Sequence, residues 1–239
     1  MKITHAMVLA AGLGTRMRPL TFETPKPLVK IAGRSLLNRA LDALEKAEVE
    51  EAVVNVHYLA DSVESHVASR KKPHITISDE RAALLDSAGG VVKALPLLGE
   101  NPFFVLNADT FWIDHGQPTL PAMANVFDHE KMDMLLLTVK RQQAAGPERG
   151  DFLVGEGQRL VRAPLNAPEA VIYGGALIAK PEIFSLAKIE PQSLNLYFDR
   201  AISQGRLYGF PLDGNWYTVG TIKMIGKVEE LIRQRGEIA

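Results

Sequence analysis

Cysteine is absent from this chain of 239 residues. Its absence excludes disulfide bridges and zinc sites with thiolate ligands, and it suits a reducing compartment such as the cytosol. A basic excess is also missing, because 27 Lys and Arg residues accompany 28 Asp and Glu residues. General nucleic-acid and membrane-surface binders need such an excess, so we expect neither partner. Any anion-binding site in this protein must therefore be local.

Long apolar runs are missing as well. No stretch approaches the roughly 20 residues of a membrane-spanning helix. The apolar run within "MKITHAMVLAAGLG" is short and ends at Gly12, which indicates a buried first strand rather than a signal peptide. We therefore expect a cytoplasmic protein. With 46% hydrophobic residues the chain can bury a full core, and we expect one domain over residues 1–239.

Strand-like and helix-like segments alternate over the first 141 residues. Strands are predicted at 6–12, 51–58, 74–79, 102–109 and 132–141, and helices at 35–47, 59–70, 90–98 and 118–131. This alternation predicts an α/β fold, with a Rossmann-like, mostly parallel, mixed sheet and helices on both faces. Beyond it we expect an irregular segment from residue 144, a hairpin turning at "GEGQ", a strand at 170–180 interrupted by two glycines, a helix at 193–205, a strand at 207–214 and a closing helix at 221–236.

The loop after the first strand has the composition of an anion-binding site. Open parallel sheets bind ligands beyond the carboxyl ends of their strands, so this loop is the first place to look. Gly12 and Gly14 let backbone N–H groups approach an anion, and Thr15 adds a hydroxyl donor. Arg16 and Arg18 add permanently charged forks that suit phosphate oxygens. The loop is therefore predicted to bind a polyphosphate.

The sequence matches neither of two familiar phosphate-binding loop patterns, and both mismatches fall on the same residue. Both a P-loop and a dinucleotide fingerprint require a glycine at a position that Met17 occupies. An ordinary βα turn with solvated arginines remains an alternative, but it does not account for Lys26, which Pro25 and Pro27 bracket. A surface lysine rarely needs such a stiff backbone.

The segments "LAAGLGTRMRPLT" and "TPKPLV" together resemble the signature of the sugar-phosphate nucleotidyltransferases. The resemblance continues through "LDSAGGVVKALPLLG", "FFVLNADTF", "RGDFLVG", "YGGALIAKPEIF", "SLNLYFDRAI" and "WYTVGT". It implies a single-domain nucleotidyltransferase (GT-A-like) fold. The chain is most similar to the short N-acetylmuramate 1-phosphate uridylyltransferases of cell-wall recycling. The implied reaction joins a nucleoside triphosphate to a sugar 1-phosphate with Mg²⁺ as cofactor and releases pyrophosphate.

The resemblance also implies a role for individual residues. Arg16, Lys26 and Asp109 would be catalytic, and Asp109 would bind the magnesium ion. The nucleotide would contact Ala10, Ala11, Gly12, Gly14, Thr15, Arg16, Lys26, Ser87, Gly89 and Gly90. The sugar would contact Asn107, Asp151, Tyr173, Gly174 and Gly175. The nucleotide-binding part would span about residues 1–110, the sugar-binding part about 111–220, and the closing helix 221–236.

One position departs from the family pattern. Many relatives have a second metal-binding aspartate two residues after the tryptophan, where this chain has Thr218. Either Asp109, phosphates and water hold the ion, or another carboxylate such as Asp213 substitutes, or catalysis is impaired. Asn195 and Asp199, four residues apart on one helix, either border the sugar pocket or form a solvated face.

Three alternatives to the uridylyltransferase remain open at this stage. The first is a guanylyltransferase for mannose 1-phosphate, and the second is a thymidylyl- or uridylyltransferase for glucose 1-phosphate. The third is a nucleotide-sugar sensor without catalysis, which only Thr218 supports. The family resemblance permits a monomer or a homodimer.

Overall fold

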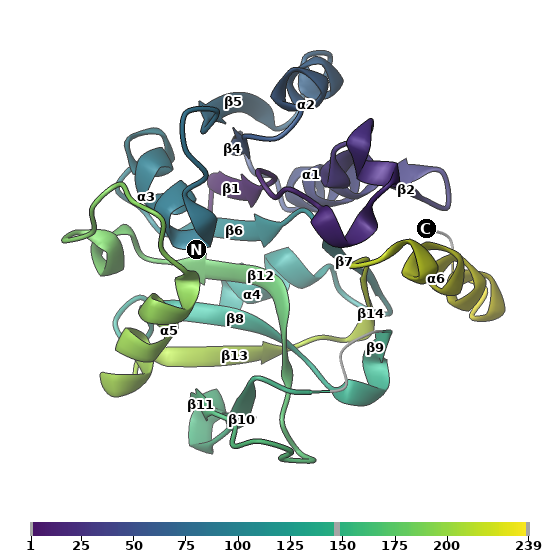
Figure 1. Cartoon of the computed structure of the whole chain (residues 1–239). Helices are drawn as coiled ribbons and strands as arrows, with labels where there is room; N and C mark the ends of the chain where they lie inside the picture. Colours follow the sequence, from purple (N-terminus) through teal and green to yellow (C-terminus); the bar gives the residue numbers. More distant parts are fainter. Residues whose placement is uncertain (1, 146–148, 238–239) are drawn as a thin grey trace.

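The computed structural model describes residues 2–145 and 149–237. Its main feature is a seven-stranded sheet with the strand order β13-β8-β12-β6-β1-β4-β5 (Figure 1). The strands of this sheet are β1 (His5–Leu9), β4 (Glu51–Val56), β5 (His74–Asp79), β6 (Phe103–Asn107), β8 (Met134–Val139), β12 (Ile172–Ala179) and β13 (Leu207–Pro211). All pairings are parallel except those that β12 makes with β6 and β8. The predicted mostly parallel, mixed sheet is therefore confirmed.

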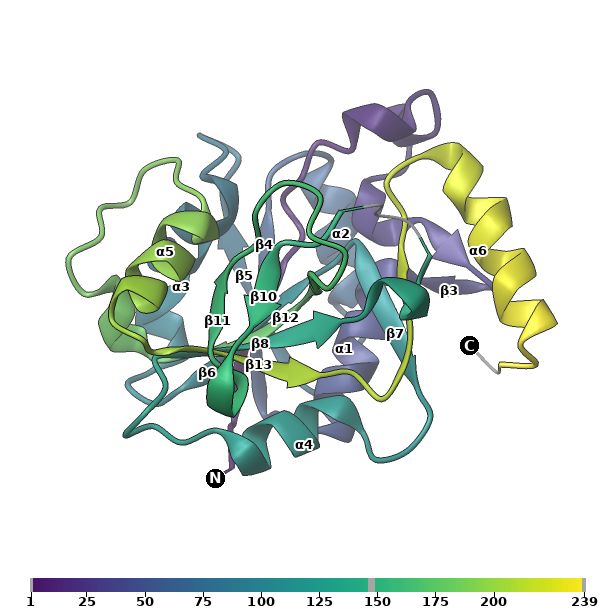
Figure 2. The same ribbon diagram turned by 90° about the horizontal axis from the view of Figure 1, so that it is seen from below.

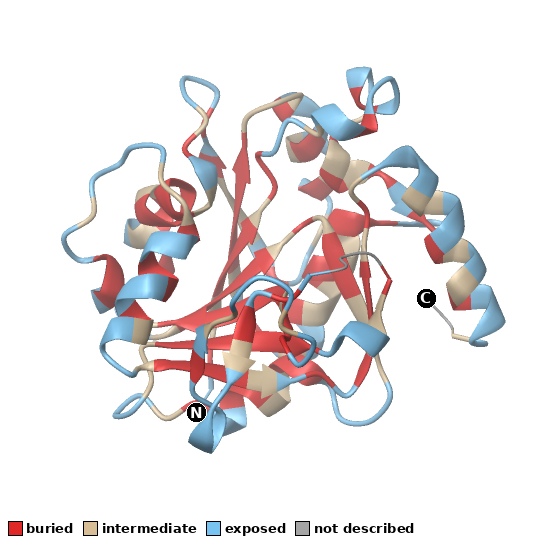
Figure 3. Cartoon of the chain, turned by 60° about the horizontal axis from the view of Figure 1, so that its bottom comes forward, coloured by how far each residue is buried: buried red, intermediate tan, exposed pale blue. Residues whose placement is uncertain are grey.

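Helices cover both faces of this sheet (Figures 1 and 2). One face packs against α1 (Leu36–Lys46), α2 (Ala60–Val67) and α4 (Thr119–Val126), and the other against α3 (Asp86–Leu98) and α5 (Leu194–Ser203). The strands alternate accordingly, because Ala6 and Val8 of β1 join the first core while Met7 joins the second. Figure 3 shows the resulting layers, with buried strands between helices whose outer faces are exposed.

Local signals account for several of the helix boundaries. Ser35 caps α1 as predicted, since its hydroxyl accepts a hydrogen bond from the backbone N–H of Asn38 at 3.1 Å. Gly205 follows α5 with a φ of +65°, a backbone conformation that favours glycine. The helix predicted from about Gly90 begins earlier, at Asp86. Backbone N–H groups of its first turn, those of Ala88 and Gly89, donate to the carbonyl of Gln192, and this contact from a distant loop was not visible locally.

A three-stranded sheet lies beside the main one, and the sequence patterns predicted none of its three strands. Its order is β7-β14-β9, with β7 at Thr110–Asp114, β14 at Gly214–Thr218 and β9 at Ala144–Ala145. The chain enters β7 directly after β6, so Asp109 lies at the junction of the two sheets. The closing helix α6 (Ile222–Gln234) packs beside this small sheet through a third core, and in Figure 2 it lies at the opposite end of the molecule from α5.

The remaining elements are short. The hairpin expected around "GEGQ" is confirmed by β10 (Phe152–Val154) and β11 (Leu160–Arg162), which are antiparallel. A second pair is β2 (Lys30–Ile31) and β3 (Arg34–Ser35). The 3₁₀ helices are η1 (Thr15–Met17), η2 (Leu20–Phe22), η3 (Lys26–Leu28), η4 (Arg141–Gln143), η5 (Glu156–Gln158) and η6 (Pro181–Phe184). Residues 146–148 of the predicted irregular segment lie outside the described residues, as do the ends of the predicted domain at residues 1 and 238–239. Within the described ranges, no helix combines the length and apolarity needed to cross a membrane.

Candidate active site

The loop after β1 lines a cavity of about 370 Å³. Most of the residues predicted to bind the nucleotide contribute to its wall, namely Ala10, Gly12, Gly14, Thr15, Arg16 and Lys26. Ala11 is buried beside the cavity and does not line it. Gly14 has a φ of +63°, and a Cβ there would lie 3.0 Å from the Cβ of Lys26 and 3.0 Å from Cγ2 of Thr21. Only glycine fits this turn without strain.

Two predicted catalytic residues form an ion pair in the same cavity. Nζ of Lys26 lies 2.6 Å from Oδ2 of Asp109, although 83 positions separate the two residues. The lysine side chain is only 12% exposed, so η3 and its prolines hold its charge in a defined place. Arg16 is a second cation that lines this cavity. Its guanidinium lies close to Gly220, where a Cβ would be 3.5 Å from Nη1. Gly220 therefore belongs to the nucleotide cavity although it lies outside the predicted nucleotide-binding part.

A buried polar network lies beneath this loop. Oδ1 of Asn55 accepts a hydrogen bond from the backbone N–H of Ala10 at 2.7 Å, and Nδ2 of Asn55 donates to Oε1 of Glu80 at 2.7 Å. Oε2 of Glu80 accepts from the backbone N–H of Leu85 at 3.2 Å. Both polar side chains are almost fully buried, at 2% and 1% exposure. The prediction from sequence missed Asn55 and Glu80, although an asparagine inside the apolar run "EAVVNV" was a visible signal.

The structure places Ser87, Gly89 and Gly90 in the first turns of α3, and none of them lines the nucleotide cavity. The hydroxyl of Ser87 accepts from the backbone N–H of Leu194 at 3.0 Å. A Cβ on Gly89 would lie 2.3 Å from the Glu190 carbonyl oxygen, and one on Gly90 would lie 2.8 Å from Nδ2 of Asn55. Close packing thus explains both glycines. Their contact with a nucleotide stays a prediction.

A second cavity of about 250 Å³ adjoins the first. The predicted sugar-binding residues Asn107, Asp151 and Tyr173 line it. It is completed by Ser87, Phe152, Arg162, Ser193, Leu194, Asn195 and Phe198. Asn107 lines the second cavity and Asp109 the first, so the two cavities lie around one short segment at the end of β6.

Gly174 and Gly175 do not line either cavity. They lie in the irregular part of β12, where the register shifts between Tyr173 and Leu177. A Cβ on Gly175 would lie 2.2 Å from Oγ1 of Thr110, and its φ is +76°. Gly175 therefore lets β12 pass close to β7, and Gly174 lets it pass close to β8, where a Cβ would lie 2.9 Å from Cγ of Leu137. Their contact with a sugar stays a prediction.

Tyr173 lines the second cavity, and its phenol interacts electrostatically with Asp109 of the first cavity. Burial raises the pKa of its phenol, and the negative charge of Asp109 raises it further. The hydroxyl therefore stays protonated at neutral pH. It finds no hydrogen-bond partner in the described part of the chain. A buried donor without a partner near Asp109 suits a substrate oxygen.

Position 218 lies beside the candidate metal ligand. Thr218 pairs with Thr110 across β14 and β7, and the backbone N–H of Val219 donates to the Asp109 carbonyl at 3.2 Å. Asp213 precedes the opposite end of β14, roughly 16 Å away at about 3.3 Å per residue, so it does not substitute for an aspartate at 218. Within residues 2–145 and 149–237, no group of three or more His, Cys, Asp or Glu side chains is placed to hold a metal.

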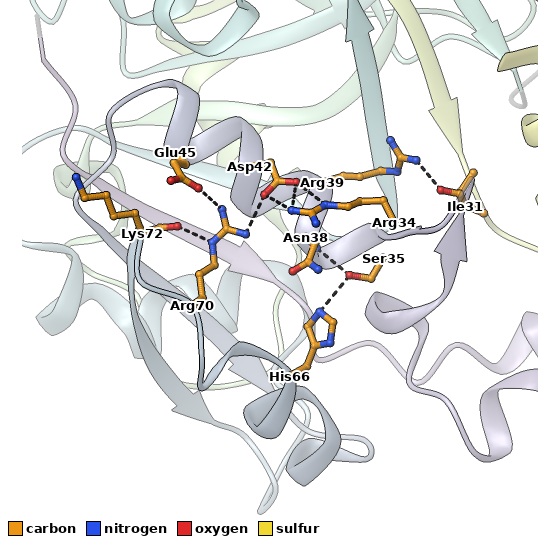
Figure 4. A network of polar contacts seen from close by, with 10 residues as sticks. All are labelled: Ile31, Arg34, Ser35, Asn38, Arg39, Asp42, Glu45, His66, Arg70 and Lys72. Atoms are coloured by element: carbon orange, nitrogen blue, oxygen red, sulfur yellow. Dashed lines mark hydrogen bonds and ion pairs between the residues drawn. The ribbon is translucent and has the colours of Figure 1, made fainter. Parts of the chain in front are cut away.

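Another cavity, of about 720 Å³, lies between α1 and β7. Two arginines in this region are paired with carboxylates. Arg34 lines the cavity and donates to Asp42 through two bonds of 2.7 Å, and Arg70 donates to Asp42 at 2.9 Å and to Glu45 at 2.8 Å (Figure 4). This network ties α1 to the segment after α2. It neutralises Arg34 and Arg70, whereas Arg39 and Lys46, which also line the cavity, form no ion pair among the described residues.

Comparison with known proteins agrees with this geometry. Residues 5–235 match the nucleotidyl transferase family. The N-acetylmuramate alpha-1-phosphate uridylyltransferase of Caulobacter vibrioides is 46% identical over 222 residues, which are 90% of this chain and 91% of that protein. A protein of the same name from Neisseria meningitidis serogroup B is 32% identical over 95% of this chain and 97% of its own length.

The comparison with solved structures concerns the fold. The solved inositol-1-phosphate CTP transferase of T. maritima has a TM-score of 0.79 at 20% identity, with 100% of this chain and 99% of that chain covered. This likeness confirms the predicted nucleotidyltransferase fold. The chain belongs to the nucleotidyl transferase family and is a sugar-1-phosphate nucleotidyltransferase.

Proposed function

We propose that this protein transfers a uridylyl group from UTP to N-acetylmuramate α-1-phosphate and releases pyrophosphate. Nucleotidyl transfer is supported by one observation: the first loop, Lys26 and Asp109 line the same cavity. Full-length similarity to two proteins named for this substrate pair supports the choice of nucleotide and sugar. Because N-acetylmuramate is a cell-wall sugar, the reaction would activate recovered wall material in the cytoplasm. Oligomeric state stays a prediction, either monomer or homodimer.

The chemistry follows from the charges in the first cavity. A phosphate oxygen of the sugar phosphate attacks the α-phosphorus in line, a new P–O bond forms, and the bond to the β-phosphate oxygen breaks. The nucleophile is already anionic at neutral pH, so no general base is required. Lys26 would hold the α-phosphate or the incoming sugar phosphate. Arg16 and the N–H groups of the first loop would hold the β- and γ-phosphates and stabilise the leaving pyrophosphate.

We also propose that Asp109 holds a magnesium ion during this reaction. The donor set suits Mg²⁺, which takes oxygen ligands and commonly combines one or two carboxylates with substrate phosphates. Asp109 lines the nucleotide cavity and is 38% exposed, so its carboxylate is accessible to the substrate phosphates. When bound, the ion would neutralise phosphate charge. With Thr218 in place of the family aspartate, Asp109 would be the only carboxylate ligand among the described residues that line this cavity.

The test is pyrophosphate release with magnesium, with UTP, dTTP, GTP, CTP and ATP each paired with N-acetylmuramate, N-acetylglucosamine, glucose and mannose 1-phosphates. We expect UTP with N-acetylmuramate 1-phosphate to dominate kcat/KM. The variant Lys26→Met, purified in parallel, controls for contaminating enzymes. Preference for GTP with mannose 1-phosphate, or for glucose 1-phosphate, would reject the proposed substrates. Binding of a nucleotide sugar with no turnover of any pair would instead indicate a sensor.

A further inference from the structure

Arg162 occupies a defined position in the second cavity. It ends β11 and is held by the helix α5, which lies beside the hairpin (Figure 2). Nε donates to Oδ1 of Asp199 at 2.7 Å, and Nη2 donates to Oδ1 and to the carbonyl oxygen of Asn195 at 2.9 and 3.2 Å. The carbon of the guanidinium lies 4.8 Å from the centre of the Phe152 ring. These contacts fix the side chain on several sides before any ligand arrives.

The same contacts leave part of the guanidinium available. Arginine has five N–H donors, and the bonds to Asp199 and Asn195 use three of them. The two N–H groups of Nη1 find no protein acceptor among the described residues. The side chain is 36% exposed. Of the described residues that line the cavity, Arg162 is the only one with a cationic side chain.

Asp151 gives this cavity a polarity. Its Oδ2 accepts a hydrogen bond from the backbone N–H of Tyr173 at 2.8 Å, so its negative charge has a neutral partner. An anionic group of a bound sugar is repelled by Asp151 and attracted by Arg162. Asp199 offsets part of the arginine charge, yet its bond to Nε leaves the Nη1 donors free. The cavity therefore favours one orientation of a sugar that carries a negative substituent.

We propose that Arg162 binds a carboxylate on the sugar substrate and thereby determines which sugar 1-phosphate reacts. This inference deepens the proposed function and rests on it. N-acetylmuramate differs from N-acetylglucosamine only by a lactic acid group joined as an ether at O3, which is ionised at neutral pH. A sugar ring without a carboxylate offers the free donors of Nη1 only hydroxyl and amide oxygens, which form weaker hydrogen bonds with a guanidinium than a carboxylate does. Arg162 is thus a specificity-determining residue, separate from the reacting atoms.

The experiment compares two sugars that differ only in this group. For the intact protein and for Arg162→Gln, kcat and KM are measured with N-acetylmuramate and N-acetylglucosamine 1-phosphates at saturating UTP. We expect the variant to lose about 10- to 100-fold of its preference for the acidic sugar, the range of one charge-assisted hydrogen bond. The loss should lie mainly in KM for the acidic sugar, and kcat/KM for the neutral sugar should fall by a much smaller factor. Arg159→Gln is the matched control, because Arg159 belongs to the same hairpin, donates to the Tyr208 hydroxyl and does not line the cavity.

A modified substrate keeps the test valid if the variant folds poorly. Conversion of the lactyl carboxylate to its carboxamide should weaken the reaction of the unmodified protein by the same factor, and it should add nothing to the loss in Arg162→Gln. Equal losses for both sugars in the variant, or a carboxamide as reactive as the acid, would overturn the inference and leave the proposed function standing. Failure of the unmodified protein to use N-acetylmuramate 1-phosphate, while it turns over another pair, would reject both.

Discussion

Replacement of Asn55 by alanine removes the centre of the polar network beneath the first loop. The variant Asn55→Ala leaves two buried groups without a partner, the backbone N–H of Ala10 and Oε1 of Glu80. Each such group costs about 1 to 3 kcal/mol, so we expect the free energy of unfolding to fall by about 2 to 6 kcal/mol. For a chain of this length, a loss of about 4 kcal/mol lowers Tm by roughly 8 to 16 °C.

The same substitution should also weaken nucleotide binding. Ala10 lines the cavity at the first loop, and its backbone N–H donates a hydrogen bond to Oδ1 of Asn55. Without that bond the loop loses a fixed point close to the donors for the phosphates, so we expect KM for UTP to rise. The measurements are thermal unfolding followed by circular dichroism and initial rates of pyrophosphate release.

Two further variants sharpen this test. Glu80→Gln keeps an oxygen that can accept from Asn55 but sets an amide N–H₂ against the N–H of Leu85, so it should cost about half as much. Asn38→Ala is the matched control, because that half-buried side chain makes no hydrogen bond within the described residues. A Tm of Asn55→Ala within about 2 °C of the unmodified protein, with unchanged KM for UTP, would refute the role that we assign to the network.

The remaining predictions concern the charges around Asp109 and one buried phenol. Lys26→Met should lower kcat by about 10²- to 10³-fold, the usual loss for one fixed donor at the reacting group, and a loss below threefold in pyrophosphate release would contradict this. Thr218→Asp adds a second carboxylate beside Asp109 and should lower the half-saturating Mg²⁺ concentration by about tenfold in calorimetric titration, so an unchanged value would count against a metal site here. Burial, aided by the hydrogen bond to Glu237, raises the pKa of Tyr217 to about 12. Since the folded pKa exceeds that of the unfolded chain, near 10, this stability is complete below pH 10 and is lost toward pH 12, so urea midpoints should fall more steeply there than in Tyr217→Phe.

The centre of the active site could be predicted because its residues follow the ends of parallel strands. The first loop follows β1 and Asp109 follows β6, and these two strands are neighbours. Parallel strands end at the same edge of a sheet, so the motif positions converge once the alternation of strands and helices is recognised. Lys26 could be included because two prolines mark it as fixed. The structure adds the distance of 2.6 Å between Nζ of Lys26 and Oδ2 of Asp109.

Other parts of the site depend on tertiary contacts that no local pattern shows. Glu80 directly follows a strand, where a charged residue is ordinarily exposed, and only its burial at 1% reveals its role. Arg162 lies in a short hairpin and acquires its place from Asn195 and Asp199 on a helix more than thirty positions away. These two helix residues were predicted either to border the sugar pocket or to form a solvated face, and the binding of a sugar beside them stays a prediction. Asn195 lines the second cavity, and Asp199 holds the arginine that does.

The segment from Thr218 to Gly220 connects the closing helix to the candidate active site. Val219 donates to the carbonyl of Asp109, and Gly220 lies against the guanidinium of Arg16. This short segment therefore contacts both Asp109 and Arg16, and α6 begins directly after it. Since α6 packs through Val228 and Ile232 on the core beneath Met17, the position of the helix is linked to that of the first loop. The cavity at the first loop is thus lined by segments from both ends of the chain, which links the position of α6 to the shape of that cavity.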